Sequence, residues 1–600
     1  MAETKRLPKR EEVKVEDTWC LEDLFATDEA WEQAVEQLEK KIEQLKGYAG
    51  RVSTSAEVMA EYLTKMDEAD HLYEKILVYS NEKMHQDMGN AKYQGYAAKA
   101  QTEAARLSAA EAFFEPEILA MPEEKLQEYF EKCEKLEQYK ILLQRILRTK
   151  EHTLSAKEEE IIAKTYEMSS APEDIYSLFN NADAKFGTII DEDGNEVELT
   201  HGRYIKFMES SDRRVRKDAF QAMYRTYEQF GNTIAATFTA NVKKAKFYAD
   251  VKKYPSSLAA ALDHGNIPTA VYDNLIDTVH RFLPSMYRYV NLRKRVLGVD
   301  ELHMYDVYTP LVSDYKMEIP FEKAKEMVKE GLAPMGEEYL SHLQEGFDNR
   351  WIDVYENQGK RSGAYSWGAY GTHPYVLLNY SGKLDDVFTL AHEMGHALHT
   401  YYSNQTQPYT YSNYLIFVAE VASTCNESLL MQHLLKNSKD KKEKAYLLNH
   451  FIDQFKGTLF RQTMFAEFEK ITHEMYAKGE SLTAESICAV YKGLNEKYFG
   501  DTMISDPEIA YEWARIPHFY TEFYVYQYAT GFSCAIALSK RILELGEEGV
   551  RDYMKFLTGG SSKDPIDLLK LAGVDISSPK PVEDALQLFD ELVSELEELL

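Results

Sequence analysis

Two histidines four residues apart, with a glutamate directly after the first, are the residues of this chain best placed to do chemistry. Residues 392–396 read His-Glu-Met-Gly-His. A helix turns about 100° per residue, so His392 and His396 would point their imidazoles from one helix face toward one spot. Two such nitrogens suit a zinc ion, and Glu393 could reach a water molecule bound to that ion. The pattern therefore predicts a metal-assisted hydrolase.

The residues around the motif predict that it lies on a helix. The run from Leu384 to Tyr402 has no proline, and its only glycine is Gly395. We expect Ser381 to cap the start of this helix, with acidic residues in its first turn. Apolar side chains recur at helical spacing through the run, at Val387, Leu390, Ala391, Met394 and Leu398.

A catalytic zinc site needs a third protein ligand and leaves its fourth position to water. Between Ala397 and Ala419 there is no Asp, Glu or Cys, so the first acid after the motif is Glu420. Glu420 lies in an apolar stretch, where a carboxylate is costly unless it is paired or bound to a metal. A ligand role explains this setting, and we therefore expect Glu420 to be the third ligand.

Two further residues could contribute to the site. His399 lies about two helical turns, roughly 10 Å, beyond His392, so three imidazoles of one straight helix could not share an ion. We expect His399 to pack or to support a ligand. Glu427 shares a helical face with Glu420 and could accept a hydrogen bond from a ligand imidazole, whereas a solvated helix face is the alternative. A metzincin site is excluded, because His399 and Tyr402 replace the glycine and histidine it needs.

Several strings around the motif carry a resemblance. Together with the motif string His-Glu-Met-Gly-His-Ala-Leu-His, these strings resemble those of the oligoendopeptidase F family. This family belongs to the superfamily that includes thimet oligopeptidase and neurolysin. The resemblance covers nearly the whole chain and is most specific in residues 360–430 and 515–532. The strings are Phe417-Val-Ala-Glu-Val-Ala-Ser-Thr, Lys360-Arg-Ser-Gly-Ala-Tyr365, His373-Pro-Tyr-Val-Leu-Leu-Asn-Tyr-Ser-Gly382, Ile516-Pro-His-Phe-Tyr520 and Phe523-Tyr-Val-Tyr-Gln-Tyr-Ala-Thr-Gly531.

The resemblance implies both a fold and an activity. The implied fold is mostly α, a large multi-helix body with a deep substrate channel and a small β-sheet beside the motif helix. The implied activity is that of a Zn²⁺-dependent endopeptidase acting on internal bonds of short, unstructured oligopeptides, because a folded protein could not reach zinc inside such a channel.

The resemblance also implies residues that stabilise the oxyanion formed in the reaction. His518 matches the family's histidine by its place in the Ile-Pro-His-Phe-Tyr string. The family uses one or more tyrosines as well, and the candidates here are Tyr520, Tyr524, Tyr526 and Tyr528. We expect Tyr524 and Tyr528 to serve, and packing in the channel wall is the alternative.

A β-prone run from Tyr375 to Tyr380 precedes the motif helix. As an exposed sheet edge it could bind a peptide as a further strand, through main-chain hydrogen bonds that do not depend on side-chain identity. We therefore expect Tyr375, Tyr380 and the neighbouring His373 to bind substrate. Gly368 and Gly371 would permit close backbone approach or a mobile flap, and ordinary turns are the alternative.

Composition excludes some partners. A net charge of −30 over 600 residues argues against nucleic acid or an anionic membrane. The first twenty residues lack the apolar core of a secretory signal, and no run has the apolar content of a membrane span. Five scattered cysteines do not suggest a disulfide framework. We expect a soluble, cytoplasmic protein whose partners are short peptides, and the oligomeric state stays open.

The order of patterns along the chain suggests two domains. Helical periodicity dominates the first half, as in the stripe formed by Trp31, Val35, Leu38, Ile42 and Leu45. Residues 186–199 read instead as two short strands around an Asp-Gly turn. We expect an N-terminal helical domain over 1–200 that ends in this hairpin, and a catalytic domain over 201–600. A last helix is expected over 582–600.

The predicted reaction is hydrolysis of a peptide bond by zinc-bound water. Zinc lowers the pKa of that water and polarises the scissile carbonyl, while Glu393 takes the water proton and passes it to the leaving amine. One alternative is an exopeptidase of the same superfamily, which needs a group to hold a terminal charge. The other is a non-catalytic peptide-binding scaffold, which would be expected to have lost Glu393 or a metal ligand.

Overall fold

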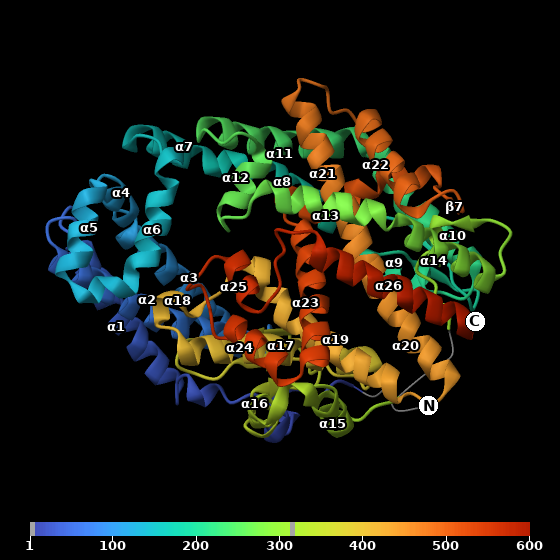
Figure 1. Cartoon of the computed structure of the whole chain (residues 1–600), viewed down its shortest axis with the longest axis horizontal. Helices are drawn as coiled ribbons and strands as arrows, with labels where there is room; N and C mark the ends of the chain where they lie inside the picture. Colours follow the sequence, from blue (N-terminus) through green and yellow to red (C-terminus); the bar gives the residue numbers. More distant parts are fainter. Residues whose placement is uncertain (1–5, 313–317) are drawn as a thin grey trace. The chain divides into compact units, whose positions relative to one another are not determined.

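Amphipathic helices make up most of the chain. The computed structural model describes residues 6–312 and 318–600, so the first five residues of the segment searched for a secretory signal lie outside the described residues. Helices dominate throughout and the sheets are small (Figure 1), which confirms the predicted mostly α fold. In the described ranges no helix is both long and apolar enough to cross a membrane.

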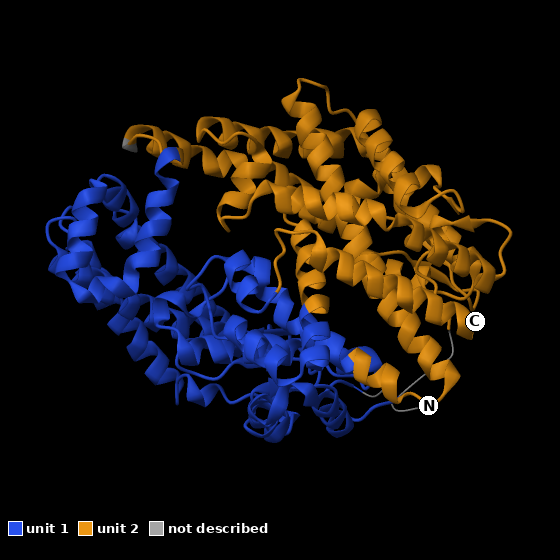
Figure 2. Cartoon of the chain, in the orientation of Figure 1, with its two compact units in different colours: residues 1–151, 316–430, 538–573 blue, residues 152–315, 431–537, 574–600 orange. Residues whose placement is uncertain are grey.

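Contacts between residues divide the chain into two units, each made of three stretches (Figure 2). Unit 1 comprises residues 1–151, 316–430 and 538–573, and unit 2 comprises 152–315, 431–537 and 574–600. These units differ from the predicted domains over residues 1–200 and 201–600. The predicted domains are continuous in sequence, and they stay a prediction.

Unit 1 contains the helices of the first stretch and the motif helix. The stripe predicted in its first helix is buried, and the hydroxyl of Thr27 caps that helix by accepting the N–H of Ala30 at 3.2 Å. The helices are α1 (Asp28–Lys46), α2 (Ala56–Gln86), α3 (Ala91–Glu111), α4 (Phe114–Leu119), α5 (Glu123–Lys132), α6 (Lys140–Arg148), α15 (Phe321–Gly331), α16 (Gly336–Asp348), α17 (Leu384–Thr406), α18 (Tyr409–Ser412), α24 (Glu547–Leu557) and α25 (Pro565–Leu571).

Unit 1 also holds a three-stranded sheet of strands β4 (Ile352–Asp353), β5 (Tyr365–Trp367) and β6 (Tyr375–Leu377). Strand β6 lies in the middle, parallel to β4 and antiparallel to β5. The prediction that this run forms an exposed sheet edge is therefore wrong. All three β6 residues are buried, because the strand is paired on both sides and packs into the core with α1 and α2.

Unit 2 contains the helices of the middle and the end of the chain. Helices α19 (Ile416–Asn437) and α23 (Tyr526–Leu545) each begin in one unit and end in the other. The remaining helices are α7 (Ala156–Ser169), α8 (Ala171–Leu178), α9 (His201–Met208), α10 (Arg213–Gln229), α11 (Gly231–Val251), α12 (Ser257–Asp263), α13 (Thr269–Arg281), α14 (Leu283–Leu297), α20 (Lys441–Gln454), α21 (Arg461–Ala477), α22 (Ala484–Phe499) and α26 (Lys580–Leu599).

Two pairs of short strands complete unit 2. Strands β1 (Thr188–Ile190) and β2 (Glu196–Glu198) are antiparallel, with Gly194 at a φ of 84° in the turn between them, which confirms the predicted hairpin. Strands β3 (Leu302–His303) and β7 (Met503–Ile504) are parallel. The predicted last helix is α26, and its apolar face is buried within the unit.

Candidate metal centre

The motif lies on helix α17, as predicted, but the helix start differs from the prediction. The N-cap position is Lys383, and Ser381 lies outside the helix. The carboxylate of Asp386 accepts the N–H groups of Ser381 at 3.0 Å and of Lys383 at 2.9 Å. An acid in the first turn thus takes the capping task that we expected of Ser381, because its side chain reaches back to the unpaired amides.

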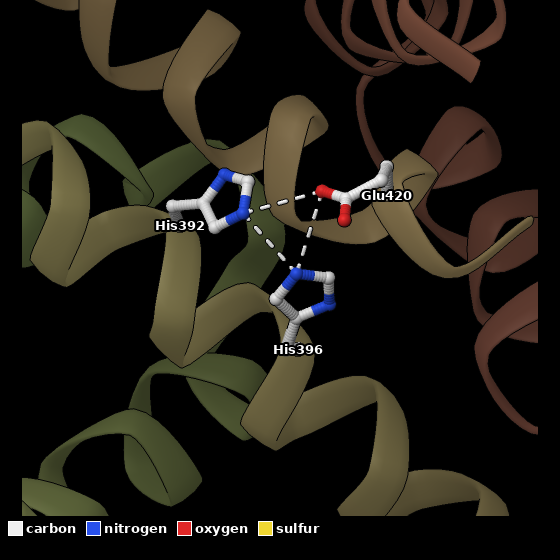
Figure 3. Close-up of side chains that lie close together, drawn as sticks. All are labelled: His392, His396 and Glu420. Carbon is white, nitrogen blue, oxygen red and sulfur yellow. Dashed lines mark hydrogen bonds and ion pairs between the residues drawn. The ribbon is translucent and has the colours of Figure 1, made fainter. Parts of the chain in front are cut away.

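Three side chains from two helices meet at one spot (Figure 3). His392 and His396 come from α17 and Glu420 comes from α19, and the Nε2 atoms of the two histidines lie 3.1 Å apart. The Oε2 atom of Glu420 lies 3.3 Å from the His392 Nε2 and 3.5 Å from the His396 Nε2. Within the part of the chain that the structure describes, these three form the one group of His, Cys, Asp or Glu residues close enough to hold a metal ion.

This triangle of atoms fits zinc. A tetrahedral ion about 2.0–2.1 Å from each ligand places its ligand atoms about 3.3–3.4 Å apart, which is close to the separations of 3.1, 3.3 and 3.5 Å found here. Two imidazoles and a carboxylate are also the donor set of many catalytic zinc sites. Burial alone would raise the pKa of Glu420, but its hydrogen bonds with the two histidines hold that pKa far below its usual range.

Glu427, about two helical turns beyond Glu420, contacts one of the candidate ligands. Its Oε1 lies 2.5 Å from the Nδ1 of His392. A carboxylate at Nδ1 requires the proton to sit on that nitrogen, which leaves the lone pair of Nε2 directed at the metal position. The side chain of Glu427 is 18% exposed, so the alternative of a solvated helix face does not describe it.

A close contact between α17 and α19 brings the ligands together. A Cβ atom on Gly395 would lie 2.6 Å from the Cα of Ser423, so only glycine permits this approach. The side-chain amide of Asn426 donates to the Ala391 carbonyl at 3.1 Å across the same contact. No role was predicted for Gly395 or Asn426 in this contact. The available signal was a glycine inside a helix, where it costs about 1 kcal/mol relative to alanine and therefore has a reason to be there.

Glu393 and His399 lie on the same helix in different settings. Glu393 is 6% exposed, and its Oε2 has no hydrogen-bond partner among the described residues. Burial raises the pKa of Glu393, and the positive charge of the two ligand histidines lowers it. His399 is buried and stacks on Tyr414 with ring centroids 3.7 Å apart, and burial lowers its pKa to about 3. His399 therefore packs, which is one of the two roles expected of it.

Three of the predicted substrate-binding side chains have contacts inside unit 1. Tyr375 is fully buried on β6, and the hydroxyl of Tyr380 donates to the Ile319 carbonyl at 2.7 Å. The ring of His373 stacks on Trp351 with centroids 5.4 Å apart. A substrate role for these residues stays a prediction.

A hollow lies beside the first turns of α17. Tyr380, one of the predicted substrate-binding residues, lines this hollow. Gly371, another predicted residue, has a φ of 78°, a conformation that favours glycine. A Cβ on Gly368 would lie 3.2 Å from the Cα of Pro374, so Gly368 allows a close backbone approach. The lining residues of the hollow are Gly363, Ala364, Leu378, Asn379, Tyr380, Asp386 and Thr389.

In unit 2, three residues predicted for the oxyanion site form one cluster. The hydroxyl of Tyr528 lies 3.3 Å from the Nε2 of His518, and the rings of Tyr524 and Tyr528 lie 5.5 Å apart at 82°. The ring of His518 stacks on that of Tyr524 at 6.1 Å. Burial and the charge of Arg461 lower the pKa of His518, which favours its neutral form.

The chain matches known protein families over most of its length. Residues 206–588 match the family described as "Peptidase family M3", and residues 117–186 match the one described as "Oligopeptidase F". The chain belongs to peptidase family M3. As an M3 member it is 50% identical to oligopeptidase PepF of Bacillus subtilis, over 100% of this chain and 90% of that protein. It is 44% identical to group B oligopeptidase PepB of Streptococcus agalactiae, over 98% of each chain.

Two solved structures are similar to the chain over nearly its whole length. Oligoendopeptidase-F from Enterococcus faecium matches with a TM-score of 0.75 and 40% identity, over 95% of this chain and 99% of that one. A structure from Chlamydophila abortus matches with a TM-score of 0.93 and 34% identity, over 99% and 100%. The predicted resemblance to oligoendopeptidase F is confirmed, and the protein is a metallopeptidase.

The other two tyrosine candidates of this M3 peptidase pack inside unit 2. The hydroxyl of Tyr520 lies 2.8 Å from the Thr237 hydroxyl, and its ring stacks on Tyr176 at 4.4 Å. Tyr526 is 3% exposed and packs on Tyr272. Tyr524 and Tyr528 are therefore the candidates that the geometry favours.

The turn that precedes Tyr524 has an unusual backbone conformation in this M3 peptidase. Phe523 has a φ of 55°, a conformation that costs free energy for a residue with a Cβ. Its N–H donates to the Oε1 of Glu469 at 2.9 Å, and Glu469 is fully buried. Burial raises the pKa of Glu469 well above its usual value. Glu469 thus holds the turn that precedes Tyr524, a role that no local sequence pattern predicts.

Proposed function

We propose that this M3 peptidase is a zinc-dependent endopeptidase that hydrolyses internal bonds of short, unstructured oligopeptides. The observation that carries the proposal is the triangle of atoms from His392, His396 and Glu420. Next in sequence to His392 is Glu393, whose Oε2 has no hydrogen-bond partner among the described residues. The cytoplasm is the compartment we propose, because the five cysteines form no disulfide and suit a reducing environment.

The residues divide the chemistry among them. His392, His396 and Glu420 would hold the ion, which when bound would lower the pKa of a water molecule and polarise the scissile carbonyl. Glu393 accepts the proton of the attacking water at its free oxygen and later donates it to the leaving amine. Glu427 keeps the His392 imidazole in the tautomer that offers Nε2.

The family resemblance and the geometry of unit 2 support an oxyanion role for a second group of residues. His518 and a tyrosine would donate hydrogen bonds to the oxygen that becomes negative in the transition state. Tyr528 is the tyrosine whose hydroxyl lies within hydrogen-bond reach of His518, and Tyr524 packs on both rings. For the substrate main chain, the hollow beside α17 that Tyr380 lines supplies a candidate surface in unit 1.

A peptide blocked at both ends tests the endopeptidase proposal. Such a peptide has no terminal charge, so an exopeptidase cannot anchor it, whereas an endopeptidase cleaves it internally. We expect mass spectrometry to show internal cleavage that stops with a chelator and returns when zinc is added. Cleavage confined to peptides with a free end would indicate the exopeptidase alternative, and no hydrolysis by zinc-loaded protein would indicate the scaffold.

A further inference from the structure

Unit 2 contains an arginine whose guanidinium has no hydrogen-bond or ion-pair partner among the described residues. Arg515 is the last residue of the short helix η10 (Pro507–Arg515) and lies three residues before His518. Its side chain is partly exposed. Across the described residues it makes no hydrogen bond and no ion pair, and its only recorded contact is with the ring of Tyr204, 5.0 Å from its Cζ.

The carboxylate whose charge acts on Arg515 is already occupied. This carboxylate is Glu512, which is 4% exposed. Its Oε1 accepts from the guanidinium of Arg461 at 2.6 Å, and its Oε2 accepts from the hydroxyl of Tyr491 at 2.5 Å. Both oxygens of Glu512 therefore have partners, and neither partner is Arg515.

The charges around Arg515 do not balance. Arg461 and Arg515 share the single carboxylate of Glu512, and the nearby cation Lys456 is paired with its own acid, Asp453, at 2.6 Å. The charge of Asp453 also acts on Arg293, so it offers no free carboxylate to Arg515. A guanidinium that is partly withdrawn from water loses hydrogen bonds to water, and here no protein group replaces them. A bound anion would accept hydrogen bonds from the guanidinium and offset that loss.

We propose that Arg515 binds a carboxylate of the peptide substrate, either the C-terminal carboxylate or an acidic side chain. The planar guanidinium offers paired N–H donors that match the two oxygens of a carboxylate. The contact with the Tyr204 ring, 5.0 Å from the Arg515 Cζ, takes up none of these donors in a hydrogen bond. The proposal rests on the proposed peptide-hydrolysing function.

Binding measurements on an inactive enzyme test this role without relying on turnover. In the Glu393→Gln background, the affinity of one short peptide is measured as its free acid, as its C-terminal amide, and as an amide carrying one glutamate. We expect the free acid or the glutamate form to bind about tenfold to a hundredfold more tightly than the plain amide, because a charge-assisted hydrogen bond is lost in the amide. The form that binds more tightly identifies the source of the carboxylate.

Two substitutions then assign the preference to Arg515. Arg515→Met is expected to abolish the difference in affinity between the peptide forms. Arg515→Lys is expected to keep part of this difference, because lysine keeps the positive charge but lacks the paired N–H donors of the guanidinium. Arg225→Met is the matched control, since Arg225 is an exposed arginine of α10 in the same unit. The control should leave the difference unchanged.

Thermal unfolding separates binding from a structural role. Removing an uncompensated charge should leave the melting temperature of Arg515→Met unchanged or raise it. A lowered melting temperature with the peptide preference intact would overturn the proposal. Equal binding of all three peptide forms by the Glu393→Gln parent would overturn it as well, while leaving the endopeptidase activity in place. No binding of any form, together with no cleavage of the doubly blocked peptide by the wild type, would reject both proposals.

Discussion

At the residue scale, the candidate metal ligands follow from spacing and from chemical cost. Histidines four apart must share a helix face, so His392 and His396 could be predicted from the sequence. Glu420 could be predicted because it is the first acid after a long acid-free run, in an apolar setting. The expectation that Tyr524 and Tyr528 serve in the oxyanion site stays a prediction, because the choice among the tyrosines depends on burial, and burial depends on which distant residues pack against each ring.

The substitution Glu420→Ala tests the third ligand. Two histidines alone hold zinc weakly, so the metal content of the purified protein should fall to near zero after dialysis, and peptide hydrolysis should fall with it. Asp385→Asn is the control, because Asp385 is an exposed acid on α17 outside the triangle. Wild-type metal content in Glu420→Ala would show that another residue is the third ligand.

At the element scale, the contact of α17 with α19 sets the distances of the site. Sequence periodicity predicts each helix but not the residue at which two helices touch, because that point depends on packing between distant segments. The same limit explains the error about β6. Its neighbour β4 is only two residues long and carries no strand pattern, so nothing in the sequence indicated that the second edge of β6 is paired.

The substitution Gly395→Ala tests whether this contact positions Glu420. The added methyl group would overlap Ser423, so α19 must shift away from α17 and the ligand triangle must open. We expect zinc affinity to fall by about tenfold or more, as for other changes that misplace a ligand. Gly95→Ala in α3 is the control, since a Cβ there meets nothing within 4 Å and should leave zinc binding unchanged. Unaltered zinc affinity in Gly395→Ala would contradict this reading of the contact.

At the scale of the whole molecule, each unit draws on three separate stretches of the chain. Residues 538–573 return to unit 1, where Asp564 forms an ion pair with Arg145 at 3.3 Å. The sequence predicted a domain boundary near 200 because the hairpin interrupts the helical pattern there. Local patterns report such interruptions, whereas the units depend on pairing between segments hundreds of residues apart, which no local pattern encodes.

Two half-buried carboxyls, Asp70 on α2 and Glu111 on α3, make the stability of the molecule depend on pH. Burial raises the pKa of Asp70 to about 7 and that of Glu111 to about 8. The charge of Asp70 raises the pKa of Glu111 further, whereas the hydrogen bond with Glu111 lowers the pKa of Asp70. The charges of Asp67 and Glu74 raise the pKa of Asp70 further. Because the folded-state pKa values are raised, the stabilisation is complete below the ordinary carboxyl range near 4 and is lost as pH rises through 7–8.

The substitution Asp70→Asn should therefore stabilise the protein at high pH only. We expect the free energy of unfolding to rise by an amount on the order of 1–3 kcal/mol at pH 8.5 and to change much less at a pH of about 4. Thermal unfolding at both pH values measures this, with Glu36→Gln on the exposed face of α1 as the control. An equal effect of Asp70→Asn at both pH values would show that the pair is not titrating.

The substitution Glu393→Gln tests the central claim most directly. Glutamine has the shape of glutamate but cannot accept the water proton, so the variant should keep a full complement of zinc while turnover of a doubly blocked peptide falls by roughly a hundredfold to ten-thousandfold. Zinc content and turnover are measured on the same preparation, which separates loss of the base from loss of the metal. Full zinc with near-zero turnover is the predicted result, and wild-type turnover by Glu393→Gln would contradict the mechanism.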